Sequence, residues 1–93
     1  MGTNPRVRPK RLAEKLCYIR TSLNLTQAEL LRRLAIDELA TQSKISEFES
    51  GKRDPSLLIL LQYSRLAGVH MEDLVDDKTD LPTKLPGNVK HRS

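Results

Sequence analysis

Apolar residues recur along the first part of this chain at the three- and four-residue steps of an amphipathic helix. The stripe consists of Leu12, Leu16, Ile19 and Leu23. Pro9, of a type favoured at the first helical position, precedes the stripe, and Asn24 follows it as a residue suited to ending a helix. The spacing therefore predicts a first helix that starts near Pro9 and turns one side toward a core.

Capping signals predict two further helices in the middle of the chain. Thr26 has the short side-chain oxygen that caps a helix, and Glu29 follows at the spacing of a capping box, so we expect a second helix over residues 27–34. Thr41 is the candidate cap of a third helix. Gly51 ends that helix, because glycine adopts the left-handed conformation of a helix C-terminus without strain.

A strongly apolar helix and a short one follow in the second half of the chain. Ser56 or Asp54 caps the fourth helix, and its residues 57–61 are apolar nearly all round. We therefore expect this run to be the buried centre of the fold. Gly68 ends the fourth helix, and residues 71–75 form a fifth.

The helices form one domain between two segments that lack helical periodicity. Residues 1–8 combine Gly, Pro and Arg and are predicted to be a flexible basic arm. Residues 9–77 hold the five helices, and residues 78–93 are predicted to be an extended tail. The expected fold class is therefore all-α.

Charge is unevenly distributed along the chain, whose 93 residues carry a net charge of +4. Residues 1–20 contain six Lys and Arg against Glu14 alone, whereas residues 70–80 contain five Asp and Glu against Lys78. We expect the first end to attract DNA and the second to be repelled by it.

Composition argues against several other functions. No apolar run approaches the ~20 residues of a membrane span, and the basic N-terminus lacks the apolar stretch of a secretory leader, so we expect no membrane partner. The single Cys17 and two histidines offer neither a disulfide nor a zinc cluster, which is typical of a reducing cytoplasm. Because no nucleophile with a base, paired carboxylates or phosphate-cradling glycine loop is present, we expect no enzymatic activity, metal, cofactor or small-molecule substrate.

The predicted third helix has a polar outer face. At 100° per residue, Ile45, Phe48 and Glu49 share its inward side. The residues left outward or in its exposed first turn are Gln42, Ser43, Ser46, Glu47 and Ser50. Such a surface is unusual for a helix that only packs, and it suits the DNA major groove, where amides and hydroxyls pair with base edges.

Several motifs in order resemble the lambda-repressor-like, or XRE-type, helix-turn-helix family. They are Thr26-Gln27, Ile45-x-x-Phe48-Glu49-x-Gly51-Lys52-Arg53, Pro55-Ser56-Leu57, Leu60-Leu61, Gly68-Val69 and Leu74-Val75. The resemblance covers about residues 10–76. It implies a five-helix, sequence-specific duplex-DNA-binding transcriptional regulator, with repression as the expected mode, the third helix in the major groove and a homodimer matched to symmetric operators. It also implies a cytoplasmic, nucleoid-associated protein of a prokaryote or phage.

The resemblance implies roles for individual residues. Base-reading positions are Gln42, Ser43, Ser46 and Glu47. Phosphate-anchoring positions are Gln27, Lys44, Ser50, Lys52 and Arg53, joined by Arg6 and Arg8 of the basic arm. Arg20 and Glu49 stand where the family has a buried ion pair between the first and third helices.

The chain departs from the family pattern between the second and third helices, where it has four extra residues within 35–40. These residues either add one turn to the second helix or form a longer loop in which Asp37 starts a short helical turn. In both cases we expect the outer face of the third helix to stay accessible.

A second function remains open at this point. The same fold serves in a protein-interaction adaptor such as an antitoxin or coactivator, and the acidic residues 72–80 would then grip a basic partner. For self-association, the apolar residues expected to be available at the fifth helix and the tail are Val69, Met71, Leu74, Val75, Leu81 and Leu85. Alternatively, Leu81 and Leu85 fold back on their own domain.

Overall fold

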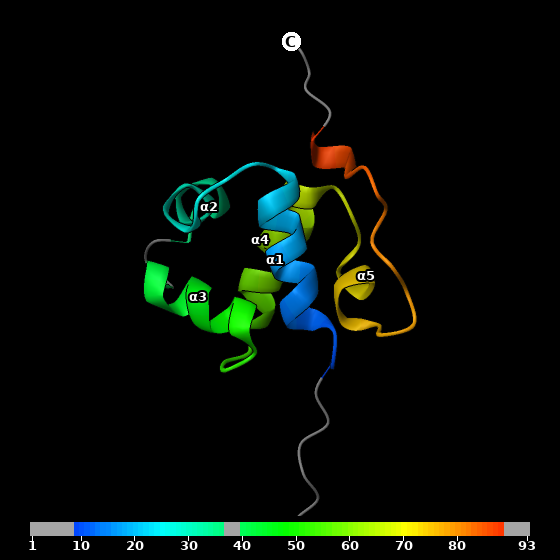
Figure 1. Ribbon diagram of the computed structural model, residues 1–93, viewed down its shortest axis with the longest axis horizontal. Coiled ribbons are helices and arrows are strands. Elements are labelled where there is room, and N and C mark those ends of the chain that lie inside the picture. The colour runs from blue at the N-terminus through cyan, green and yellow to red at the C-terminus, as the bar shows by residue number, and fades with distance from the viewer. Residues whose placement is uncertain (1–8, 37–39, 89–93) are drawn as a thin grey trace, which may run out of the picture.

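The computed structural model describes residues 9–36 and 40–88 of the chain, and these form five α-helices and one 3₁₀ turn (Figure 1). The elements are α1 (Leu12–Ser22), α2 (Gln27–Leu34), α3 (Gln42–Ser50), α4 (Leu57–Ala67), α5 (Met71–Val75) and η1 (Pro86–Asn88). No strand occurs in the described ranges, so the predicted all-α, five-helix fold is confirmed. The basic arm predicted at residues 1–8 lies outside the described residues.

Side-chain caps start three of the helices where the sequence predicts them. At α2, Thr26 Oγ1 accepts from the Glu29 N–H at 3.1 Å while Glu29 Oε1 accepts from the Thr26 N–H at 2.8 Å, which is the predicted capping box. The Thr41 hydroxyl caps α3 by accepting from the Lys44 N–H, and Ser56, rather than Asp54, caps α4. Local sequence thus fixes where these helices begin.

The end of α2 decides between the two arrangements expected for the four extra residues. Ala35 has a φ of 57°, so α2 stops at Leu34 and does not gain a further turn. Leu34 and Ile36 are both buried, and two helical steps would place them 200° apart, so the chain must leave the helix to bury both. The helical turn expected at Asp37 lies outside the described residues.

The core lies where α1 and α4 occupy the middle of the fold, with α2 and α3 to one side and α5 to the other (Figure 1). Its largest fully buried side chains are Leu16, Ile19, Leu30, Leu34, Ile36, Ile45, Tyr63, Leu74 and Leu85. Each of the five helices contributes at least one side chain to this set. The helices therefore share one core.

The prediction that residues 57–61 form the buried centre is wrong at the start of α4. Ile59 and Leu60 are buried, but the relative exposure of Leu57 is 75% and that of Leu58 is 51%. A helix turns by 100° per residue, so a continuous apolar run cannot face one core throughout. The inward side of α4 is instead set by Ile59, Leu60 and Tyr63.

Residues 78–88, the described part of the segment predicted to be an extended tail, pack back on the domain. Leu85 is buried in the core and Leu81 is partly buried against it. The Tyr18 hydroxyl of α1 is within 3.0 Å of the Pro82 oxygen and 2.9 Å of the Thr83 oxygen. Because Leu74 and Leu85 are buried, the expectation that they are available for self-association is wrong; Val69, Met71 and Leu81 are partly buried and Val75 is exposed.

Candidate nucleic-acid interface

The acidic C-terminal segment binds the basic start of α1. The Asp77 carboxylate accepts from the Lys10 N–H at 2.9 Å and from the Arg11 N–H at 3.0 Å. The Arg11 guanidinium also lies 2.7 Å from Asp80 Oδ1. Asp77 satisfies N–H groups that a helix start leaves unpaired, and α1 accordingly begins at Leu12, three residues later than Pro9 predicted.

Lys15 connects the same two segments through hydrogen bonds of its buried side chain. Its side chain is buried, and its ammonium donates to the backbone oxygens of Asp73 at 2.7 Å, Asp76 at 2.8 Å and Thr79 at 2.6 Å. Three donors meet three acceptors, so the buried charge is fully hydrogen-bonded. Contacts of Lys10, Arg11 and Lys15 therefore join the basic and acidic ends, which were expected to attract and to repel DNA separately.

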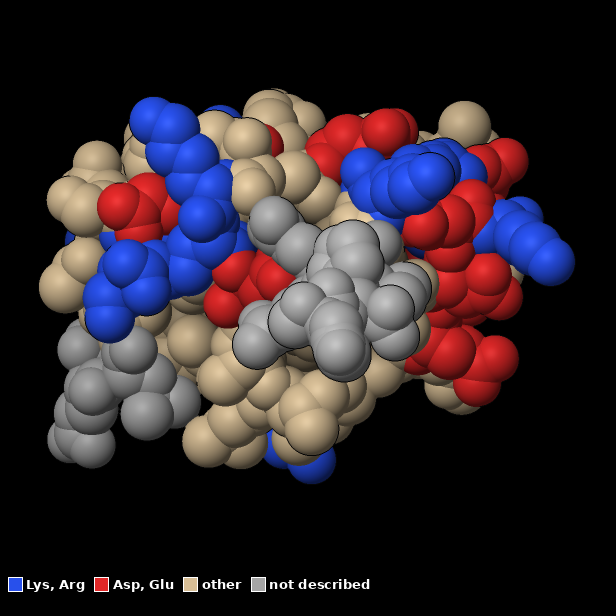
Figure 2. Space-filling model, turned by 90° about the horizontal axis from the view of Figure 1, so that it is seen from below, with Lys and Arg blue, Asp and Glu red and all other residues tan. Residues whose placement is uncertain are grey.

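Exposed positive charge is also present after the end of α3. Lys52 and Arg53 are exposed in the loop that follows α3. Figure 2 shows a group of Lys and Arg on the α3 side of the view, whereas on the α5 side Lys and Arg are interspersed with most of the Asp and Glu. A polyanion would therefore meet the α3 side.

The outer face of α3 carries the predicted base-reading residues next to the start of α2. Gln42, Ser43 and Ser46 are exposed, and with Gln27 they line a shallow hollow of about 290 Å³. All four side chains are polar and uncharged, so the hollow offers amides and hydroxyls that both donate and accept hydrogen bonds. Since Ser43 is exposed and the Glu47 side chain is 39% exposed, the expected accessibility of this face is confirmed.

An ion-pair network behind this face joins α1, α2 and α3. Arg20 Nε lies 2.7 Å from Glu49 Oε2, with side-chain exposures of 20% and 7%, so the ion pair expected between these residues is present. Gln27 Nε2 donates to Glu49 Oε1 at 3.3 Å, and the Arg20 guanidinium donates to the Leu25 oxygen at 3.0 Å. The pair thereby sets the position of Gln27 at the edge of the hollow.

Tyr63 lies in the core close to this network. Its side chain is fully buried, and its hydroxyl has no hydrogen-bond partner among the described residues. Burial raises the pKa of the Tyr63 hydroxyl well above its usual range, and the nearby Glu49 carboxylate raises it further. The tyrosine is therefore neutral and contributes its ring to the core.

Glu47 holds the loop that carries the exposed cations. Its Oε1 is 2.6 Å from Arg53 Nε, and its backbone oxygen accepts from the N–H groups of Lys52 at 3.0 Å and Arg53 at 3.3 Å. The hydrogen bond from Arg53 lowers the pKa of the Glu47 carboxyl, so the carboxylate is ionised at neutral pH. A predicted base-reading residue is thus bound to a predicted phosphate-anchoring one.

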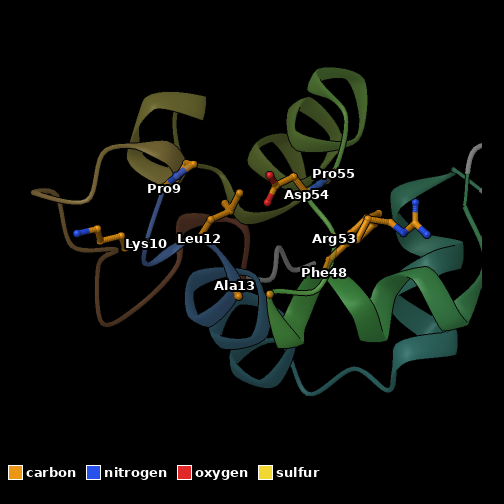
Figure 3. Close-up of a pocket in the computed structure, with 9 residues that line it drawn as sticks. Pro9, Lys10, Leu12, Ala13, Phe48, Arg53, Asp54 and Pro55 are labelled. Atoms are coloured by element: carbon orange, nitrogen blue, oxygen red, sulfur yellow. The ribbon is translucent and has the colours of Figure 1, made fainter. Parts of the chain in front are cut away.

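A second hollow lies on the other side of this loop, between the starts of α1 and α4. It has a volume of about 320 Å³, and Leu12, Ala13, Phe48 and Pro55 contribute apolar surface to it (Figure 3). Arg53 also lines this hollow, and Figure 3 shows its guanidinium extending away from Pro9 and Lys10, on the side of α3.

The remaining predicted site residues are placed as follows. Lys44 is partly buried on α3, and Ser50 is exposed with its hydroxyl 3.2 Å from the Glu47 oxygen. Arg6 and Arg8 lie outside the described residues. Sequence reasoning missed the pairing of Glu47 with Arg53, because a separation of six residues across a helix end has no fixed geometry. The alternation of acidic and basic residues around Gly51 was the available signal.

Two other kinds of site are missing from the described ranges. His, Cys, Asp and Glu side chains within them nowhere form a group of three that could hold a metal ion. None of the helices there has the length and apolar character needed to cross a membrane.

The chain is similar in sequence to a known protein. A protein of Methanocaldococcus jannaschii, described as an uncharacterized HTH-type transcriptional regulator, is 35% identical over 63 residues. These residues are 68% of this chain and 89% of the relative. No protein-family model matches the chain, and no solved structure matches it.

Proposed function

Because the chain belongs to the helix-turn-helix family of transcriptional regulators, we propose that it binds a specific duplex-DNA site with α3 in the major groove and represses by occupying that site. The observation that carries the proposal is the uncharged polar hollow of Gln27, Gln42, Ser43 and Ser46. It is exposed at the start of α3, and the basic loop follows the end of the same helix. A groove-reading surface needs this combination of base-pairing groups and flanking cations.

The proposal divides the contacts into two classes. Gln42 reads bases, since an amide can make a paired hydrogen bond with adenine, and Ser43 and Ser46 add hydroxyl contacts. Lys52 and Arg53 meet phosphates, which carry no sequence information. Further phosphate contacts are proposed for Gln27, Lys44 and Ser50, and for Arg6 and Arg8 of the arm. The start of α2 at Gln27 supports this division, because N–H groups at a helix N-terminus favour an anion.

The proposed setting is that of an XRE-type regulator acting in the cytoplasm of a prokaryote or on a phage genome. The order of motifs supports this finer assignment. DNA binding of this kind needs no cofactor and no catalytic group, and none is part of the proposal. The acidic end, which an adaptor would need, is partly occupied by Lys10, Arg11 and Lys15, and this favours DNA binding over the adaptor.

We propose a homodimer on DNA, with the contact at the start of α4. Leu57 and Leu58 are exposed there, and α4 carries no charged side chain before Arg65. A two-fold contact brings equal residues of two copies together, so leucines would meet leucines, whereas a contact through α5 would bring carboxylates together. Two leucines are a small part of the roughly 800 Å² that each partner contributes to a stable interface. The contact is therefore expected when DNA holds two copies side by side.

Selection of bound sequences from a random duplex pool tests the proposed function. We expect one enriched motif with two-fold symmetry, and binding of that motif that resists competition by random duplex. Binding that weakens with salt on every duplex alike, with no enriched motif, would contradict the proposal and leave only a general affinity for polyanions.

A further inference from the structure

Glu47 stands at the border between the two classes of proposed DNA contact. On α3 it is one turn from Ser43 and adjacent to Ser46, which line the polar hollow. On its other side its carboxylate holds Arg53 at 2.6 Å. The ionised Glu47 side chain therefore contacts a proposed phosphate-anchoring residue and also lies beside proposed base-reading residues.

The pair is accessible to a ligand from solvent. The side chains of Arg53 and Glu47 are 51% and 39% exposed, so neither is locked in the interior. The Nε group of Arg53 is the donor that Glu47 occupies, and a guanidinium also donates strongly to phosphate. A duplex phosphate that binds the guanidinium side-on, through Nε and one Nη group, is thus a direct competitor of the Glu47 carboxylate for Arg53 Nε.

Release of Arg53 leaves Glu47 with an unbalanced charge. A carboxylate only accepts hydrogen bonds, and most groups at the floor of the major groove that face it are acceptors too. The exceptions are the exocyclic amines of cytosine and adenine, which donate; the adenine amine lies beside the N7 acceptor of the same base, whereas cytosine presents no acceptor there. The freed carboxylate is therefore best satisfied opposite cytosine.

From this arrangement we infer that Glu47 is a specificity-determining residue that exchanges partners, giving up Arg53 to a phosphate and accepting from a cytosine amine in its place. The inference rests on the proposed use of α3 in the major groove. It couples the two contact classes, because Arg53 reaches its phosphate only where the base opposite Glu47 is cytosine. At other bases the pair stays closed and one phosphate contact is not made.

The test compares the wild type with Glu47→Gln and Arg53→Ala on the preferred duplex and on its single-base-pair variants, over a range of salt concentrations. In the wild type we expect one C·G pair whose replacement lowers affinity about 10-fold and also reduces the salt slope by about one, since one phosphate contact is lost. In Glu47→Gln the slope should be the same on all duplexes, and replacement of that pair should cost less than about 2-fold. In Arg53→Ala the slope on the preferred duplex should fall to the value of the replaced one.

Three controls make the result decisive. Glu47→Gln keeps the backbone oxygen that holds Lys52 and Arg53, so circular dichroism should show an unchanged fold. Glu72→Gln on α5 removes the same charge from an exposed residue outside the proposed interface and should leave base preference and salt slope unchanged. Gln42→Ala should lose preference at its own base pair.

An unchanged base preference in Glu47→Gln, or a wild-type salt slope equal on all duplexes, would overturn the partner exchange. If Gln42→Ala still loses its preference in that experiment, the proposed function stands and the exchange alone is wrong. If Gln42→Ala also keeps every preference, α3 does not read the groove and both proposals fail.

Discussion

Arg20 and Glu49 form an ion pair, 2.7 Å from Nε to Oε2, that joins α1 to α3 behind the proposed DNA-binding face. The Glu49 side chain is 7% exposed, so its removal leaves the Arg20 charge without its partner in a largely buried position. We expect Glu49→Ala to lower the free energy of unfolding by about 3–5 kcal/mol. Urea denaturation followed by circular dichroism measures this change.

Glu72→Ala on α5 is the matched control, since Glu72 is exposed. It should change stability by no more than about 0.5 kcal/mol. A loss below about 1 kcal/mol in Glu49→Ala would show that the pair behaves as an exposed one.

Tyr63 offers a substitution that should not destabilise the core. Its hydroxyl is buried and has no hydrogen-bond partner among the described residues, whereas its ring fills the core. Tyr63→Phe keeps the ring and removes the unpaired polar group, so we expect stability to be unchanged or raised by up to about 1 kcal/mol. Thermal unfolding measures it, and a loss above about 1 kcal/mol would reveal a partner such as a buried water.

Asp77 should make stability depend on acid pH. The N–H groups of Lys10 and Arg11 hold the pKa of its carboxyl below the usual range. A folded-state pKa below the unfolded value, about 3.9, adds stability above that value, and the stability is lost as pH falls through the folded pKa. We therefore expect Asp77→Asn to be less stable than the wild type at pH 7, with the difference lost as pH falls through the lowered pKa of the folded state.

Unfolding free energies measured between pH 7 and pH 2 check this prediction. Glu72→Gln serves as the control and should follow the wild-type curve. A constant difference between wild type and Asp77→Asn over the whole range would show that the carboxylate charge does not stabilise the start of α1.

Local signals predicted the helices because their causes are local. Thr26 and Glu29 satisfy N–H groups three residues away, and Gly51 and Gly68 end helices through their own backbone conformation. The run at residues 57–61 failed because an unbroken apolar segment contains no polar residue to mark its outer side. The apolar run therefore located α4 but gave no information on which side of the helix faces the core.

The sequence pattern did not predict contacts between residues that are far apart in the chain. Arg11 and Asp77 are 66 residues apart, and the separate basic and acidic segments gave no sign that they bind each other. At the proposed interface, the family resemblance gave the Arg20–Glu49 pair because both positions belong to a shared motif. Glu47 and Arg53 belong to no such pair, so their contact required the folded chain.

The exposed leucines of α4 predict cooperative binding. Leu57→Glu should leave the fold intact, because Leu57 is 75% exposed, but it should repel the same residue in a second copy. We expect the second copy to bind a two-half-site duplex about 10-fold more weakly, with binding to one half-site unchanged. Val75→Glu on α5 is the control, and titration by native gel measures both. Equal loss in the two variants, or none in Leu57→Glu, would contradict a contact at α4.

The central claim is that α3 reads bases while the loop after it holds phosphates, and salt titrations of Gln42→Ala and Lys52→Ala on the preferred and a random duplex test it most directly. Lys52→Ala should weaken both duplexes alike and reduce the salt slope by about one. Gln42→Ala should cost about 1–3 kcal/mol on the preferred duplex and leave the random duplex nearly unaffected. If the two variants lose the same affinity on every sequence, α3 does not read the groove and the claim is wrong.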